Sequence, residues 1–378
     1  MTGCAIKEIG MVSALGLDAE NACAAARAGL SRLMALEVKN FVEEKKWDGG
    51  PVYGHCVPNL GRGFVGKGKV TLLGEHGLRN LMAKVERVGM DTERTGFYLH
   101  LSDYGVIAEA DCRENDEVSA DRTDTNRPAQ NAWTLQGAEI LNAILRGAGL
   151  EVDPTSCNIS HGDHTGVFNL IKTACDALLN NEYDSCIVGA VDSKVEPRYL
   201  DAAADLLMLR TESYQAGFMP GEAAAFILLQ RDSDPLGELN SVRISKLELA
   251  DEGVSYLDEA RPVGVELARV INSVCSLDRS ETPEMPGVLI GDLNGWEARS
   301  ADWGNAVIRL MPDIDVSKVP LWLPAISFGE TGAASGVVAI AMAMAAHRRG
   351  YAPPGASVIW LASLTGRRGA IKLDSYDC

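Results

Sequence analysis

One order of elements occurs twice along the chain of 378 residues. In the first half, a helix of small residues at about Thr165–Asn180 precedes two apolar strands, Ser185–Val191 and Ala223–Leu229. In the second half, a helix at Gly332–Arg349 precedes two more, Ser357–Ala362 and Ala370–Leu373. Strands that are apolar along their whole length are typical of sheets covered on both faces. The sequence therefore predicts an α/β protein made of two similar halves, residues 1–235 and 236–378.

The charge balance limits the classes of partner. Acidic residues outnumber basic ones by 52 to 35, which gives a formal charge of −17. Such a surface repels nucleic-acid phosphates and anionic lipids, so we expect neither nucleic acid nor membrane as a partner. The opening MTGCAIKEIG lacks the pattern of a signal peptide, and nine scattered cysteines without a CxxC motif are typical of a reduced compartment. We therefore expect a cytoplasmic protein.

Between residues 102 and 136 the sequence becomes polar and charged. This composition predicts a solvated insertion at the surface of the first half. A lid or a docking loop for a partner is the alternative, and the residues do not separate the two.

Two short motifs resemble ligand sites. GRGFVG at Gly61–Gly66 fits GxGxxG, but its flanks do not read as the strand and helix that a phosphate-binding turn requires, so we expect an ordinary loop. His161 and His164 are three residues apart, but no second pair of ligands accompanies them. We therefore expect no metal and no cofactor.

Four segments together resemble the β-ketoacyl synthases of the thiolase superfamily. They are residues 9–31, 184–191 (DSCIVGAV), 216–230 (AGFMPGEAAAFILLQ) and 329–354, which begins GETGAASG. The resemblance implies a thiolase-like fold of five layers, αβαβα, usually found as a homodimer or heterodimer. It also implies a catalytic cysteine at the start of the central helix and two histidines from the second half.

The position of the catalytic cysteine is occupied by a histidine. Counting back one full helix from Gly189 places His164 there, whereas Cys175 falls within the helix as a buried apolar residue. The positive end of the helix disfavours an imidazolium, so we expect the pKa of His164 below about 6.5 and a neutral ring at pH 7.

The two histidine positions also differ from the family. Asp292 stands at one of them, and Gly329 or Glu330 stands at the other. Further candidates for the pocket or its gate are Asp163, Thr165, Phe218, Asn294, Phe328, Ser363 and Arg367. We expect His164, Asp292 and Glu330 to converge, either as a general-base arrangement or as the filling of a former pocket.

The leading hypothesis is a catalytically degenerate synthase-like protein that works by binding. It would be a non-condensing partner subunit, as a chain-length factor is, or an accessory protein for a bacterial secretion effector or its chaperone; an acyl chain is a further candidate ligand. The alternative is an acyl-thioester hydrolase or acyltransferase that uses His164 with Asp292 or Glu330.

Overall fold

The computed structural model describes most of the chain, and every structural statement below concerns these residues. They are 3–38, 50–61, 63–85, 90–103, 105, 107, 130–232, 241–276, 284–311 and 313–375, with side chains omitted at 130–136. Most of the expected insertion at 102–136 and the expected boundary between residues 235 and 236 lie outside the described residues. That boundary and the role of the insertion remain predictions.

The first half contributes five strands, hydrogen-bonded in the order β5-β4-β6-β7-β1. They are β1 (Cys4–Ser13), β4 (Thr95–Ser102), β5 (Cys157–Gly162), β6 (Ser185–Ser193) and β7 (Glu222–Arg231). β4 pairs in parallel with β5 and β6, whereas β7 pairs antiparallel with β6 and β1.

The second half repeats this arrangement strand for strand in the order β10-β9-β11-β12-β8. The strands are β8 (Val242–Asp251), β9 (Val288–Gly291), β10 (Leu321–Trp322), β11 (Ser357–Ala362) and β12 (Arg367–Ser375). The directions are the same, with parallel pairs around β9 and antiparallel pairs around β12. The prediction of two similar halves is therefore confirmed. A short antiparallel ladder between Cys4–Ile6 of β1 and Val242–Ile244 of β8 joins the sheets.

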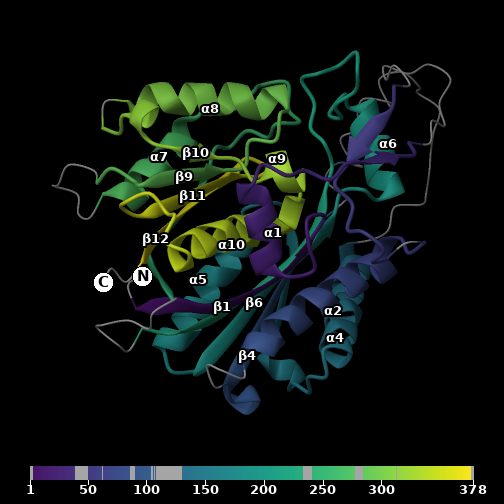
Figure 1. Cartoon of the computed structure of the whole chain (residues 1–378), viewed down its shortest axis with the longest axis vertical. Helices are drawn as coiled ribbons and strands as arrows, with labels where there is room; N and C mark the ends of the chain where they lie inside the picture. The colour runs from purple at the N-terminus through teal and green to yellow at the C-terminus, as the bar shows by residue number, and fades with distance from the viewer. Residues whose placement is uncertain are drawn as a thin grey trace.

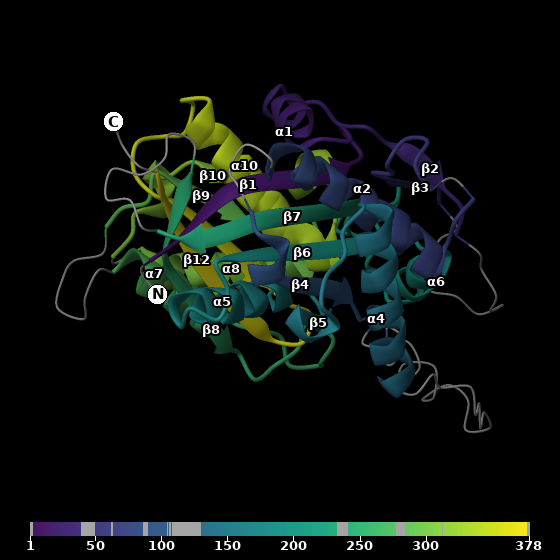
Figure 2. The ribbon, with the colours of Figure 1, turned by 90° about the horizontal axis from the view of Figure 1, so that it is seen from below.

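Helices and sheets alternate in five layers (Figure 1). The outer helices of the first half are α2 (Gly66–Val85) and α4 (Gln130–Gly147); those of the second half are α7 (Val265–Cys275) and α8 (Glu297–Leu310). Between the sheets lie α5 (Gly166–Leu179) and α10 (Ser335–Arg348). Figure 2 shows β1, β7, β6, β4 and β5 one below the other. The thiolase-like αβαβα fold is therefore confirmed.

Smaller elements surround these layers. They are α1 (Ala19–Arg27), β2 (Met34–Leu36), β3 (Val52–Gly54), α6 (Pro197–Asp205) and α9 (Ala325–Phe328). Among the described residues, no helix is both long and apolar enough to cross a bilayer.

The two central helices are built for burial on several sides. α10 reads SGVVAIAMAMAAHR, and small residues around its circumference let it pack between two sheets. α5 buries Phe168, Ile171 and Cys175 in the same core. Cys175 has no exposed surface, as expected for an apolar residue within the helix.

The GRGFVG segment differs in part from its expected context. Helix α2 begins at Gly66, the last glycine of the motif. The prediction that no helix follows the motif is therefore wrong. No strand ends at Gly61, because β3 ends at Gly54. The Gly66 N–H donates to the Glu196 carboxylate at 2.7 Å. A carboxylate therefore occupies the helix terminus that a phosphate would need.

Gly10 of β1 provides a test of how closely the first two layers pack. A Cβ atom at this position would lie 2.2 Å from the Leu81 backbone nitrogen and 2.5 Å from the Gly77 carbonyl oxygen of α2. Backbone cannot rotate away, so we expect Gly10→Ala to lower the free energy of unfolding by about 1–3 kcal/mol. Gly304→Ala is the control, because its Cβ would meet nothing within 4 Å in α8. The control should be neutral or stabilising in urea denaturation; equal losses in both variants would contradict this account.

Candidate functional site

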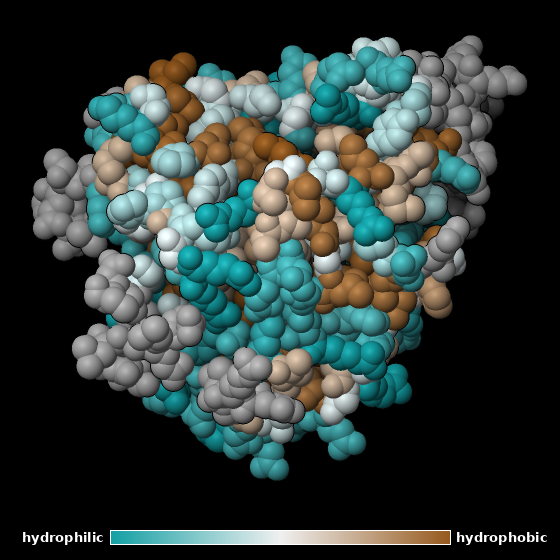
Figure 3. Space-filling view, viewed as in Figure 1, coloured by the Kyte–Doolittle hydropathy of each residue, from teal (hydrophilic) through white to brown (hydrophobic). Residues whose placement is uncertain are grey.

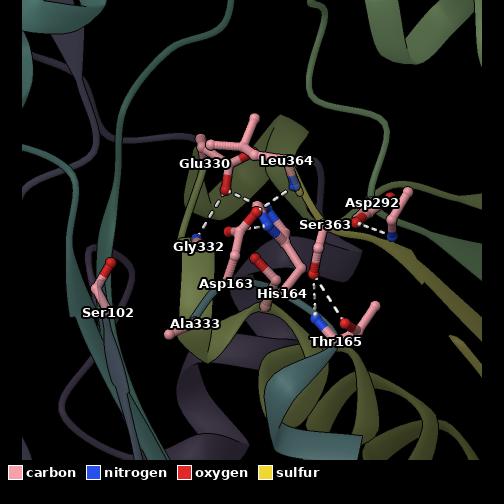
Figure 4. A network of polar contacts seen from close by, with 12 residues as sticks. Ser102, Asp163, His164, Thr165, Asp292, Glu330, Gly332, Ala333, Ser363 and Leu364 are labelled. Atoms are coloured by element: carbon pink, nitrogen blue, oxygen red, sulfur yellow. Dashed lines mark hydrogen bonds and ion pairs between the residues drawn. The ribbon is translucent and has the colours of Figure 1, made fainter. Parts of the chain in front are cut away.

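The N-terminal ends of the two central helices meet where the halves face each other (Figure 4). The turn before α5 carries Asp163, His164 and Thr165, and the segment before α10 carries Glu330. The loop after β11 adds Ser363 from the second half. Residues far apart in sequence thus form one buried polar cluster.

His164 lies between two carboxylates. Its Nδ1 atom hydrogen-bonds Asp163 Oδ1, and its Nε2 atom lies 2.6 Å from Glu330 Oε1. Ionised carboxylates only accept hydrogen bonds, so both ring nitrogens donate and the ring is an imidazolium. His164 is only 2 % exposed, so this ion triad is shielded from water.

The charges of the triad reinforce one another. Burial alone would lower the pKa of His164, but the Asp163 and Glu330 carboxylates outweigh it and raise that pKa to about 9. The His164 charge in turn outweighs burial at Glu330 and lowers its pKa to about 2. In the same way it holds the pKa of Asp163 below its usual range. The expectation of a neutral His164 is therefore wrong, because two adjacent carboxylates exceed the effect of the helix terminus.

Arg299 of α8 connects Asp292 to this triad. Its Nη1 atom donates to Asp292 Oδ2 at 2.9 Å and to the Ala362 carbonyl at 2.5 Å. Its Nη2 atom lies 3.2 Å from each ring nitrogen of His164. Burial raises the pKa of Asp292 despite the nearby Arg299. The structure thus brings His164 and Glu330 into direct contact, whereas Asp292 is linked to His164 through Arg299.

Glu330 has further partners that fix its carboxylate. Asn294 donates its side-chain amide to Oε2, and the Gly332 N–H donates to Oε1 at 2.7 Å. Gly329 has a φ of +74°, and a Cβ there would lie 2.8 Å from the His55 ring. Glu330, not Gly329, is therefore the residue whose side chain faces His164.

The loop after β11 is bound to the start of α5. The Ser363 hydroxyl accepts from the Thr165 N–H at 3.0 Å and lies 2.8 Å from the Thr165 hydroxyl. The Leu364 N–H donates to Asp163 Oδ2. These contacts close the cluster on the side of the loop (Figure 4).

The free space beside the cluster is small. A cavity bordered by Asp292, Glu330 and Thr331 has a volume of about 10 Å³. This is about the room that one water molecule requires, far below the several hundred Å³ of a typical ligand pocket. This cavity is therefore too small to hold an acyl chain.

Three other candidates lie outside the cluster. Phe218 packs against Tyr199 in a separate core, with ring centroids 6.5 Å apart. Phe328 is buried in the core between the sheets, and Arg367 is exposed at the start of β12. Its neighbour Arg368 is fully buried and lies 3.2 Å from Asp302.

Sequence reasoning missed three charged members of the site. Besides Arg299, these are Asp192 near the end of β6 and Lys194 directly after it, which lie 3.2 Å apart. Asp192 also accepts the Ala333 N–H at 2.9 Å, and Lys194 lies 4.3 Å above the Tyr199 ring. The signal available in the sequence was the charge itself, because Lys194 closely follows the end of the predicted buried strand Ser185–Val191.

Part of the chain matches a known protein family. Residues 157–235 match the family model described as "Beta-ketoacyl synthase, N-terminal domain". A search of curated proteins gave no match.

Solved ketosynthase structures share the fold at low sequence identity. The ishigamide ketosynthase/chain length factor is 15 % identical with a TM-score of 0.65, over 98 % of this chain and 99 % of that one. AntDE:AntF, a type II PKS acyl-carrier protein in complex with its ketosynthase bound to the hexaketide, is 12 % identical with a TM-score of 0.72, over the whole of both chains. An oxazolomycin ketosynthase domain from Streptomyces albus JA3453 is 12 % identical with a TM-score of 0.68, over 99 % of this chain and 74 % of that one. Residues 157–235 therefore match the β-ketoacyl synthase family, and the chain as a whole shares the fold of these ketosynthase structures.

Proposed function

We propose that the chain is a non-condensing ketosynthase-like subunit that acts by binding a condensing partner. The observation that carries this proposal is the buried triad of Asp163, His164 and Glu330. A condensing site needs a nucleophile and room for an acyl chain, whereas this site holds an imidazolium with both nitrogens engaged and a cavity of about 10 Å³.

The triad also argues against the alternative of a hydrolase that uses His164. A general base must have an unprotonated nitrogen near the operating pH. The raised pKa of about 9 keeps His164 protonated at neutral pH, and both of its nitrogens donate to carboxylates. His164 therefore lacks the free lone pair that proton abstraction requires.

Exposed apolar side chains support a role in protein binding. On the face shown in Figure 3, hydrophobic residues gather across the upper half, the part that holds α8, β10 and α9 in Figure 1. Ile308 of α8 is 71 % exposed, and Ile326 of α9 is 64 % exposed. Large apolar groups that remain in contact with water are common at protein interfaces. The solved structure described as the ishigamide ketosynthase/chain length factor makes a ketosynthase the preferred partner.

Co-expression with a cysteine-bearing ketosynthase from the same genome tests the proposal. We expect the two chains to co-purify in a 1:1 complex, and the acyl products of the ketosynthase to change in length when this chain is present. Size-exclusion chromatography and mass spectrometry of the products provide the measurements. The ketosynthase alone is the control. A chain that purifies only with itself and leaves the products unchanged would refute the proposal, as would release of free thiol from acyl thioesters that depends on His164.

A further inference from the structure

Helix α8, in the outer layer of the second half, carries a largely apolar stripe along its outward face (Figure 1). Residues that follow one another at alternating intervals of four and three positions lie on one face of a helix. In α8 and its C-cap these residues are Glu297, Ala301, Gly304, Ile308 and Met311, here called the α8 stripe. All five are exposed, and Ile308, at 71 %, is the most exposed large apolar residue in the described part of the chain.

The middle of the α8 stripe is made of small residues. Glycine is among the least favourable residues inside a helix, and a Cβ atom on Gly304 would meet nothing within 4 Å. Packing within the described chain therefore gives no reason for a glycine at this position. Together with Ala301, one turn earlier, Gly304 leaves a shallow surface that the backbone of a second helix could approach closely.

The two ends of α8 carry opposite charges. Glu297 lies in the first turn and Arg309 in the last, where the helix dipole favours each of them. Both side chains are exposed, and within the described residues neither forms an ion pair. A second copy of the helix that runs in the opposite direction would place its Arg309 beside Glu297 and its Glu297 beside Arg309. The charge pattern of α8 is thus complementary to itself.

One register of such an antiparallel pair satisfies both charge and shape. When the helices cross between Ala301 and Gly304, the small residues of the two copies face each other and the oppositely charged ends lie at the same level. Ile308 of each copy then lies at the level of Ala298 of the other, so the large side chain is covered and meets a small one. The two sets of contacts are equivalent, as a two-fold axis requires.

The net charge limits where two copies of this chain can meet. A formal charge of −17 makes two copies repel each other over most of their surface. Between its charged ends, however, α8 exposes uncharged residues, namely Ser300, Ala301, Gly304 and Ile308. This stretch of the helix lets two copies come into contact without placing like charges against each other.

We propose that the α8 stripe is an interface between two copies of this chain, formed by antiparallel packing of α8 on α8 about a two-fold axis. The inference goes beyond the proposed function, because the contact joins identical chains and requires no ketosynthase. Two complexes with a ketosynthase would be joined through α8 into one larger assembly.

Sedimentation equilibrium of the purified full-length chain tests the interface. We expect Ile308→Lys to raise the dissociation constant by roughly 100-fold or more, because each pair of copies loses two buried isoleucines. Gly304→Gln should also weaken association, since its side chain has free space in one chain but blocks the crossing of two. Val65→Lys is the matched control and should have no effect. Val65 is 62 % exposed and directly precedes α2, which lies on the opposite side of the molecule from α8 (Figure 1).

An exchange of charges tests the antiparallel register. Glu297→Arg and Arg309→Glu should each weaken association by about tenfold, because each single variant places like charges opposite each other. The double variant restores opposite charges and should recover most of the wild-type association. A role of these residues within one chain alone would not produce this recovery.

The outcomes separate association from folding and from the proposed function. A wild-type chain that does not self-associate, or an assembly that Ile308→Lys and Gly304→Gln leave unchanged, overturns the inference. If both variants fail to fold by circular dichroism, the charge exchange decides, and a double variant that recovers nothing overturns it as well. Because the chain is measured alone, a failure to co-purify with a ketosynthase leaves this result unaffected.

Discussion

Replacing His164 with alanine is expected to lower the free energy of unfolding by about 3–5 kcal/mol, because the change leaves two buried carboxylates without their common cation. Asp163 and Glu330 both hydrogen-bond the imidazolium, and their side chains are only 9 % and 4 % exposed. Arg299 compensates only in part, since its Nη1 atom is engaged by Asp292 and the Ala362 carbonyl. Urea denaturation followed by circular dichroism measures the loss.

Two further variants show whether charge is the cause. His347→Ala removes a half-buried histidine that contacts the neutral Ser357 hydroxyl, and we expect it to cost about 1 kcal/mol. Adding Glu330→Gln to His164→Ala removes one of the uncompensated charges, so the double variant should lose less than the sum of the single losses. Additive effects, or a His164→Ala loss no larger than that of the control, would show that the triad does not hold charge.

The second large effect is a loss of stability at alkaline pH. The folded-state pKa of His164 is raised to about 9, above the ordinary value of 6.5, so its contribution is complete below about 6.5 and disappears as the pH rises through about 9. The difference between these two values corresponds to about 3 kcal/mol. The lowered pKa of Glu330, about 2, acts in the opposite direction: its contribution is present above the ordinary value of 4.5 and disappears as the pH falls through about 2.

Unfolding free energies between pH 6 and pH 10 test this expectation. Tyrosine, lysine and cysteine side chains also titrate at the alkaline end, so His164→Ala is the necessary control. The variant should lack most of the decline between about pH 6.5 and 9 that the wild-type chain shows. Parallel curves for the two proteins would contradict a protonated His164.

Much of the architecture was predictable because it depends on patterns within short segments. The strand at Ser357–Ala362 was placed at its observed bounds, and the central helices were placed within a few residues. Continuous apolar runs identify such elements without tertiary information. The start of α2 at Gly66 was missed because a glycine-rich segment with two lysines lacks the apolar period of a helix at its first turn.

The site was predictable in some of its members but not in its charge. Family spacing predicted that His164 lies near Asp292 and near Gly329 or Glu330, whereas the contribution of Arg299 depends on how α8 packs over the second sheet. The protonation of His164 follows from two carboxylates, one adjacent in sequence and one 166 positions away. Such a balance depends on distances that spacing alone does not give. The assignments of catalytic loss and of pocket residues remain predictions.

Several polar contacts of the site run from one half of the chain to the other. His164 meets Glu330, Thr165 meets Ser363, and Asp192 meets the Ala333 N–H, whereas the sheets themselves share only a short ladder at β1 and β8. Glu330 of the second half has its closest cation, His164, in the first half. Although the topology is duplicated, the halves are thermodynamically interdependent, and they should unfold in a single cooperative transition with no half-folded intermediate.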